Sequence, residues 1–131
     1  MQSEANTMSR VARIGSTCLI NVDIVISSGA DFFNGYRYEE IVSNGGREGV
    51  DISNWKGYMA FAKGNTRVLQ CDDCLTLNEE GFVNVHMPPE VTSQLKRGVY
   101  DYNIVLKTEG GYVISFVEGE ATVSEIIPEV D

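Results

Sequence analysis

The side chains best suited to chemistry in this chain are one histidine and three cysteines. His86 alternates with polar residues along a predicted strand, so we expect it on the exposed face. Cys71 and Cys74 form a C-x-x-C pair. A structural zinc site usually combines two such pairs, or one pair with two histidines, but the sequence has no second pair and only Cys18 and His86 could supply the other two ligands. Because Cys71 and Cys74 stand three apart in an alternating segment, they are expected to point to opposite faces. The sequence therefore predicts unligated thiols and no metal.

Motifs that organise catalysis or phosphate binding are absent from the sequence. There is no G-x-S-x-G turn to expose a nucleophilic serine. Neither G-x-x-x-x-G-K-[ST] nor G-x-G-x-x-G occurs. Asp72 and Asp73 could bind calcium from a loop, although the D-x-[DN]-x-[DN]-G spacing is missing. We therefore predict no catalytic residues, no cofactor and no enzymatic activity.

Carboxylates gather in the last part of the chain, where no Lys or Arg follows Glu109. They lie on one predicted strand and a tail, and not across a cleft. A charged edge that discourages edge-to-edge aggregation is therefore favoured over glycoside chemistry. The acids concerned are Glu109, Glu118, Glu120, Glu125, Glu129 and Asp131.

Six aromatic side chains mostly occupy in-phase positions of predicted strands, which indicates core packing. The alternative is an exposed platform on which carbohydrate rings could stack. These aromatic residues are Tyr36, Tyr38, Trp55, Tyr58, Tyr100 and Tyr102.

Length and charge narrow the class of protein. The chain has 131 residues and is 43% hydrophobic, which suits one globular domain. Its formal net charge is −9, and an acidic surface is repelled by phosphate backbones and anionic membranes. We therefore expect neither nucleic acid nor membrane as a partner.

Two-residue hydrophobic alternation is the main structural pattern in the chain. It predicts about seven strands, with a bulge or bend at 118–120 in the last. Glycine-rich turn signals separate the strands at 27–29, 44–46, 64–65, 79–81, 97–98 and 109–111. The predicted strands are 19–26, 32–38, 57–62, 74–78, 82–87, 99–106 and 112–123.

The short spacing of these strands predicts an all-β fold, an immunoglobulin-like antiparallel β-sandwich. One short helix is expected near 89–95, because Pro88 and Pro89 suit a first turn and Val91 and Leu95 would share a face. This helix is expected to cross from one sheet to the other.

The domain is expected to span 18–131, preceded by a flexible N-terminal arm at 1–17. The arm is polar and lacks the apolar stretch of a secretory signal, so synthesis in the cytoplasm is expected. It carries Arg10 and Arg13, and it is either a frayed terminus or a segment that becomes ordered against a neighbouring subunit.

The order of several motifs resembles a family of small immunoglobulin-like sandwich proteins of tailed bacteriophages. Members occur as free virion proteins or as the N-terminal domain of BppU-type baseplate and fibre proteins. The chain departs from the family in its C-x-x-C pair, its arm, and the lack of a fibre or receptor-binding domain after the sandwich. The similar segments are 24–32, 50–58, 81–85, 95–104, 119–123 and 128–130.

The resemblance implies a non-enzymatic virion structural protein, made in the host cytoplasm and located in the virion. It would be a head decoration subunit or an adaptor that anchors fibres to the tail or head. Its partners would be other virion proteins, namely capsid, tail or fibre subunits, with several copies or a homo-oligomer in each particle. The alternative is a ligand-binding sandwich for carbohydrate or calcium, using Trp55 or the Asp72/Asp73 loop.

Overall fold

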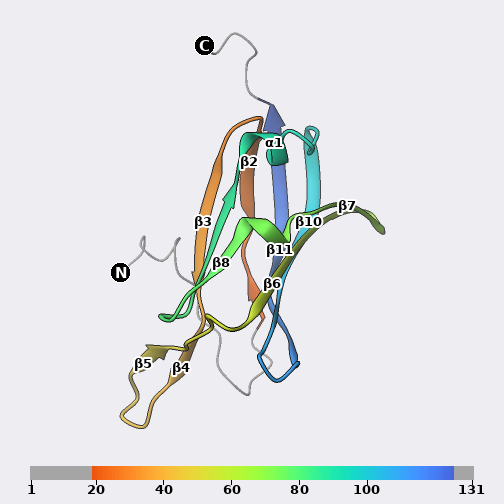
Figure 1. Ribbon diagram of the computed structural model, residues 1–131. Coiled ribbons are helices and arrows are strands. Elements are labelled where there is room, and N and C mark those ends of the chain that lie inside the picture. The colour runs from red at the N-terminus through yellow and green to blue at the C-terminus, as the bar shows by residue number, and fades with distance from the viewer. Residues whose placement is uncertain (1–18, 126–131) are drawn as a thin grey trace.

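The protein is a β-sandwich of two facing sheets with a short hairpin at one end, described for residues 19–125 by a computed structural model (Figure 1). The predicted arm at 1–17, Cys18, Glu129, Asp131 and the similar segment 128–130 lie outside the described residues.

The larger sheet has six strands in the order β7-β6-β10-β11-β1, with β2 also paired to β11. Its hairpin turns, β6–β7 and β10–β11, lie at the predicted turn signals 64–65 and 109–111. The strands are β1 (Ile20–Asn21), β2 (Ile24–Ser28), β6 (Lys56–Lys63), β7 (Thr66–Gln70), β10 (Gly98–Lys107) and β11 (Val113–Glu125).

The smaller sheet has three strands in the order β3-β9-β8, and a separate hairpin pairs β4 with β5. The turns that close β4–β5 and β8–β9 lie at the predicted signals 44–46 and 79–81. The strands are β3 (Phe32–Arg37), β8 (Leu75–Leu77), β9 (Phe82–Met87), β4 (Glu39–Ile41) and β5 (Arg47–Gly49).

The predicted all-β sandwich is confirmed, but its pairing is not antiparallel throughout. The predicted strand 19–26 is divided into β1 and β2, and both run parallel to β11. The break contains Asp23, whose carboxylate accepts a hydrogen bond from the backbone N–H of Glu120 (2.9 Å). Strands β4, β5 and β7 were not predicted, because these short, charged segments show no sustained alternation.

The predicted irregularity of the last strand is misplaced. Ile104 pairs with Val117 and Val105 with Ser115, so the extra residue is Phe116 and not one of 118–120. Gly119 is needed for a different reason: a Cβ there would lie 2.1 Å from the backbone oxygen of Val22. The glycine therefore allows the β1–β2 segment to lie against β11.

The predicted helix is shorter than expected. α1 spans Pro89–Thr92, and the chain then continues in turns to Leu95, which is buried. It does connect the two sheets, since it follows β9 and precedes β10. Buried Thr92 anchors it, because its hydroxyl donates to the Ala30 carbonyl (2.8 Å) and accepts from the Gly29 N–H (3.0 Å).

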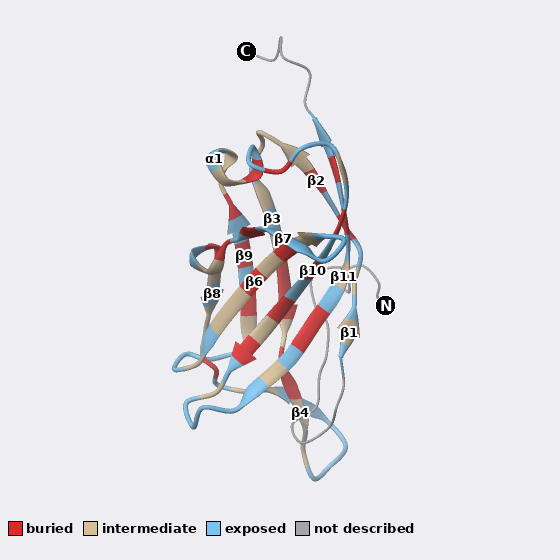
Figure 2. Ribbon diagram, turned by 90° about the vertical axis from the view of Figure 1, so that its right-hand side faces the viewer, coloured by how far each residue is buried: buried red, intermediate tan, exposed pale blue. Residues whose placement is uncertain are grey.

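The core lies between the sheets, and alternating buried and exposed positions along β10 and β11 show which face is inside (Figure 2). Tyr36 of β3 and Tyr102 of β10 meet there, with their hydroxyl oxygens 3.1 Å apart. Tyr102 donates its hydroxyl hydrogen to the carbonyl of Val22 (2.5 Å). This network joins the two sheets to the β1–β2 segment.

Candidate functional site

His86 lies on the exposed face of β9, as its alternation predicts. Its Nε2 is 2.8 Å from a carboxylate oxygen of Asp31, and its ring stacks on Phe33 with centroids 4.5 Å apart. Half of the His86 side chain is exposed. These contacts give the histidine a surface role between β9 and β3.

Cys71 and Cys74 are both buried, so the prediction that they point to opposite faces is wrong. The alternation is interrupted there by a 3-10 turn, Asp72–Cys74, in which the backbone N–H of Cys74 donates to the carbonyl of Cys71 (3.1 Å). Burial, followed by the neighbouring Cys74, raises the pKa of the Cys71 thiol to about 12. Burial also raises the pKa of Cys74. Both groups are therefore protonated, weakly nucleophilic thiols at neutral pH.

The residues predicted for ligand binding in the alternative hypothesis already have structural contacts. An Asp72 oxygen accepts from the backbone N–H of Met59 (3.1 Å) and from the amide of Gln70 (3.2 Å). Trp55 packs edge-on against Tyr38, with ring centroids 5.4 Å apart. Among residues 19–125, no group of three or more His, Cys, Asp or Glu side chains could hold a metal ion.

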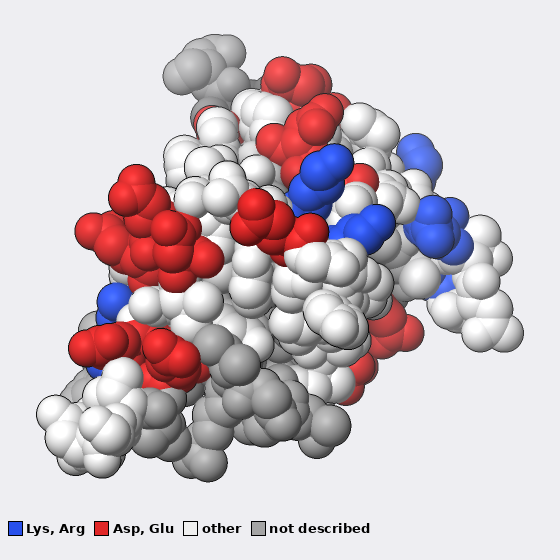
Figure 3. All heavy atoms as spheres, turned by 60° about the horizontal axis from the view of Figure 1, so that its bottom comes forward, with Lys and Arg blue, Asp and Glu red and all other residues white. Residues whose placement is uncertain are grey.

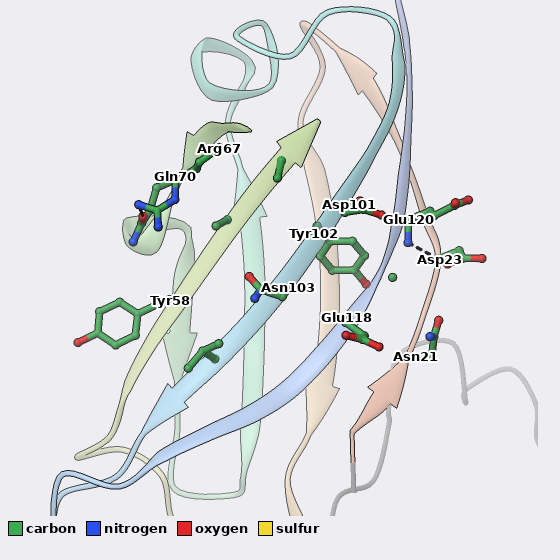
Figure 4. A pocket seen from close by; sticks show the side chains of 14 residues that line it. Asn21, Asp23, Tyr58, Arg67, Gln70, Asp101, Tyr102, Asn103, Glu118 and Glu120 are labelled. Atoms are coloured by element: carbon green, nitrogen blue, oxygen red, sulfur yellow. Dashed lines mark hydrogen bonds between the residues drawn. The ribbon is translucent and has the colours of Figure 1, made fainter. Parts of the chain in front are cut away.

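A groove of about 860 Å³ lies on the outer face of the six-stranded sheet (Figure 4). We call it the sheet-face groove. It is lined by Asn21, Asp23, Tyr58, Ala60, Ala62, Arg67, Gln70, Asp101, Tyr102, Asn103, Val105, Glu118, Gly119 and Glu120.

The strand register explains why this face is hollow. One row across the sheet reads Arg67, Ala62, Asp101 and Glu120, from β7 to β11. Successive members of a row are direct cross-strand neighbours about 5 Å apart. Because a methyl group stands between longer side chains, the row has a low floor at Ala62.

The next row has the same form and is wider. It reads Gln70, Ala60, Asn103, Glu118 and Asn21, from β7 to β1. Ala60 continues the low floor of the first row. The side chains of Gln70 and Asn21 close the two sides of the groove.

The two walls of the groove differ in charge. Arg67 and Gln70 form one wall and are hydrogen-bonded to each other at 2.8 Å. The other wall, which we call the acidic wall, contains Asp23, Asp101, Glu118 and Glu120 (Figure 4). Positively charged or hydrogen-bond-donating groups would be favoured beside the acidic wall.

Aromatic residues contribute little to the groove. Tyr58 lines one end and is partly exposed, and Tyr102 contributes from β10 while its hydroxyl is directed into the core network. Tyr36, Tyr38, Tyr100 and Tyr102 are buried, which confirms the predicted core role for these four.

Sequence reasoning placed Glu118 and Glu120 on an exposed strand but did not identify the groove. Most groove residues occupy the polar positions of the alternating pattern. Because every exposed sheet face has such positions, they do not mark a groove. The one available signal was the pair of small residues Ala60 and Ala62 at alternating positions of an otherwise bulky strand. It becomes informative only when the register places them beside Asp101 and Asn103.

A second, smaller hollow of about 310 Å³ lies beside the two cysteines, between the β7–β8 connection and α1. Its lining includes Cys71, Asp72, Cys74, Val91 and Gln94. Both thiols are buried, and burial raises the pKa of each, so neither is a reactive thiolate in this hollow at neutral pH.

Comparison with known proteins gives no family. No family model matches the chain, and no curated protein matches its sequence. Among solved structures, one similar chain is a Bacteroides ovatus mixed-linkage glucan utilization locus protein, SGBP-B, in complex with a mixed-linkage heptasaccharide (15% identity, TM-score 0.37). Another is a family 123 glycoside hydrolase from Clostridium perfringens (10% identity, TM-score 0.42).

Each of these two matches covers 82% of this chain and 23% of the other protein. At such TM-scores they carry no argument about function.

In the described residues, no helix is long and apolar enough to cross a membrane.

Proposed function

We propose that this chain is a non-enzymatic structural protein of a tailed-phage particle, either a head decoration subunit or an adaptor that anchors fibres to the tail or head. The observation that supports it is the order of the similar segments along the chain. In the structure, each described segment has a role in holding the sandwich frame. The resemblance is therefore carried by residues that shape the fold and not by residues of a catalytic site.

The segment 50–58 shows this framework role. The Asp51 carboxylate accepts from the backbone N–H (3.0 Å) and the hydroxyl (2.7 Å) of Ser53, which forms a tight turn. Ile52 is fully buried beside this turn, and Trp55 then packs on Tyr38. The motif ends the loop and begins β6.

The segments 81–85 and 95–104 have similar roles. At Gly81 the backbone has φ of 93°, and a Cβ would lie 2.5 Å from the Tyr38 carbonyl. In 95–104, Leu95, Tyr100 and Ile104 are buried in the core. Both segments therefore fix how the strands pack.

The histidine and the two described cysteines lie in separate places, away from the sheet-face groove. His86 lies on the outer face of β9, whereas the two cysteines are buried near α1. The sheet-face groove is lined by neither. A rigid sandwich present in many copies can instead act by docking, because repeated weak contacts add up to strong attachment.

The test is quantitative mass spectrometry of density-purified phage particles from a host strain that carries the gene. We expect the chain in the particle fraction at a fixed copy ratio to the major capsid or tail protein. A ratio that follows the capsid protein supports decoration, and a low ratio that follows the tail protein supports the adaptor role. Absence of the chain from washed particles would refute the virion proposal.

A further inference from the structure

Cys71 and Cys74 are the first and last residues of a hydrogen-bonded turn, at the point where the chain passes from the larger sheet to the smaller one. β7 ends at Gln70 and β8 begins at Leu75, and the 3-10 turn Asp72–Cys74 lies between them. The backbone N–H of Cys74 donates to the carbonyl of Cys71 (3.1 Å). This bond fixes the spacing of the two cysteines.

The geometry of the turn suits a disulfide. In a 3-10 turn, residues three apart face the same direction, and their Cα atoms lie about 6 Å apart. A disulfide joins Cα atoms about 4.4–6.8 Å apart. Both thiols are buried in the same core cluster, and both line the second hollow. A bond between Cys71 and Cys74 therefore needs little movement of the backbone.

Hydrogen bonds to β6 hold the turn in place. The backbone N–H of Cys71 donates to the carbonyl of Met59 (2.9 Å), and the N–H of Met59 donates to the carboxylate of Asp72 (3.1 Å). The amide of Gln70 donates to the same carboxylate (3.0 Å). Disulfides often fail to stabilise a protein because they distort its native geometry. Here the contacts with β6 set a suitable geometry before any bond forms.

The second hollow limits which oxidants reach the thiols. Cys71 is 6% exposed and Cys74 7% exposed, and the hollow beside them measures about 310 Å³. A water molecule occupies about 30 Å³, so the slightly larger hydrogen peroxide molecule fits there.

Charge favours an uncharged oxidant. Asp72 and Asp73 line the same hollow, and the chain has a formal net charge of −9. Carboxylates also form several groups on the face shown in Figure 3. This negative charge repels anionic disulfides such as oxidised glutathione. A small neutral hydroperoxide meets no such barrier.

We propose that Cys71 and Cys74 are a redox site, which hydrogen peroxide or a similar small hydroperoxide converts to an intramolecular disulfide. One thiolate attacks a peroxide oxygen and the O–O bond breaks, which gives a sulfenic acid and a hydroxide that takes up the thiol proton as water. The other thiolate attacks the sulfenic sulfur, the S–O bond breaks, and a second water forms in the same way. Each sulfur is oxidised by one electron, and the peroxide is reduced to two waters. The site does not depend on the virion role.

The disulfide locks the crossing between the two sheets. It stabilises the fold mainly by restricting the unfolded chain, and a loop this short gives a small gain. We expect the melting temperature of the oxidised protein to rise by roughly 5 °C. Because both thiols are protonated at neutral pH, oxidation is slow there and faster at mildly alkaline pH.

The test uses the full-length chain with Cys18→Ser, so that Cys71 and Cys74 are its only thiols. The folded protein is treated with hydrogen peroxide at mildly alkaline pH, and the remaining thiols are blocked with N-ethylmaleimide. Both cysteines lie in one tryptic peptide, 68–96, and fragment spectra locate any change within it. We expect Cys71–Cys74 to be unblocked and to have lost two hydrogen atoms, in a monomer. Dithiothreitol should restore both thiols.

The matched controls are Cys71→Ser and Cys74→Ser, each added to the Cys18→Ser chain. A single thiol cannot form the bridge, so it should carry N-ethylmaleimide or added oxygen. Added oxygen on the cysteines of the intact pair, in place of the loss of hydrogen, would overturn the proposal. Linked dimers of the pair would also overturn it, and so would a folded pair that stays reduced under conditions that fully oxidise the chain in urea.

A second measurement tests the route and the geometry. Dithionitrobenzoate, a bulky anionic disulfide, should react with the folded pair at least about tenfold more slowly than with the chain in urea. Equal rates would refute the selection for a small neutral oxidant. A melting temperature that falls on oxidation would show that the bridge strains the turn, and would overturn the inference that the turn suits a disulfide.

Discussion

Replacing Tyr102 with Phe tests whether the hydroxyl network joins the two sheets. The hydroxyl of Tyr102 donates to the Val22 carbonyl and lies 3.1 Å from the hydroxyl oxygen of Tyr36. The variant keeps the ring and its stacking on Phe61, whose centroid is 6.0 Å away. It therefore removes hydrogen bonds with little change in packing volume.

The expected loss of stability follows from the burial of this network. Tyr102 is 3% exposed and Tyr36 1% exposed, so water cannot easily replace the missing hydroxyl. A buried polar group left without its partner costs about 1–3 kcal/mol. We expect the free energy of unfolding to fall by about 2 kcal/mol, and the melting temperature to fall by about 6–10 °C for a domain of this size.

Equilibrium urea unfolding followed by Trp55 fluorescence measures the change, with Tyr58→Phe as the matched control. Tyr58 lines the groove and is partly exposed, so its variant should unfold within about 0.5 kcal/mol of the wild type. A Tyr102→Phe variant as stable as the control would refute the view that this network holds β1 and β2 against the sandwich.

Three further changes test other parts of the structure. Gly119→Ala places a Cβ against a backbone oxygen and should destabilise by more than about 1 kcal/mol in thermal melts, whereas Gly110→Ala meets ordinary contacts and should cost less. Because the folded-state pKa of Cys71 is raised from its usual value of 9.0 to about 12, the unfolded thiol ionises first as pH rises. Stability should therefore be full below pH 9 and decline between pH 9 and about 12, and Cys71→Ser should lessen that decline in urea titrations at each pH. His86→Ala removes an exposed stack and ion pair and should change the unfolding free energy by less than about 1 kcal/mol, and a larger loss would contradict its surface role.

The local elements of this fold follow from its sequence. Alternation along 99–106 and 82–87 predicts β10 and β9, because successive side chains of a strand point to opposite faces. Glycine-rich turns predict four hairpin connections, since a tight turn depends mainly on the residues within it. His86 was also placed correctly on an exposed face for this local reason.

The pairing between strands that are far apart in the sequence could not be predicted from local patterns. The parallel alignment of β1 and β2 with β11 joins residues about a hundred positions apart, and nothing local encodes it. The 3-10 turn at Asp72–Cys74 breaks the alternation, which is why the cysteines were assigned to opposite faces and lie together.

The sequence by itself determined that the chain folds into short amphipathic strands with a polar outer surface, because that information resides in neighbouring residues. Tertiary structure alone decided that Ala60 and Ala62 form the floor of a groove between Arg67 and a wall of carboxylates. The reason is physical: the register between strands sets which side chains become neighbours. That register results from packing the whole inner face at once.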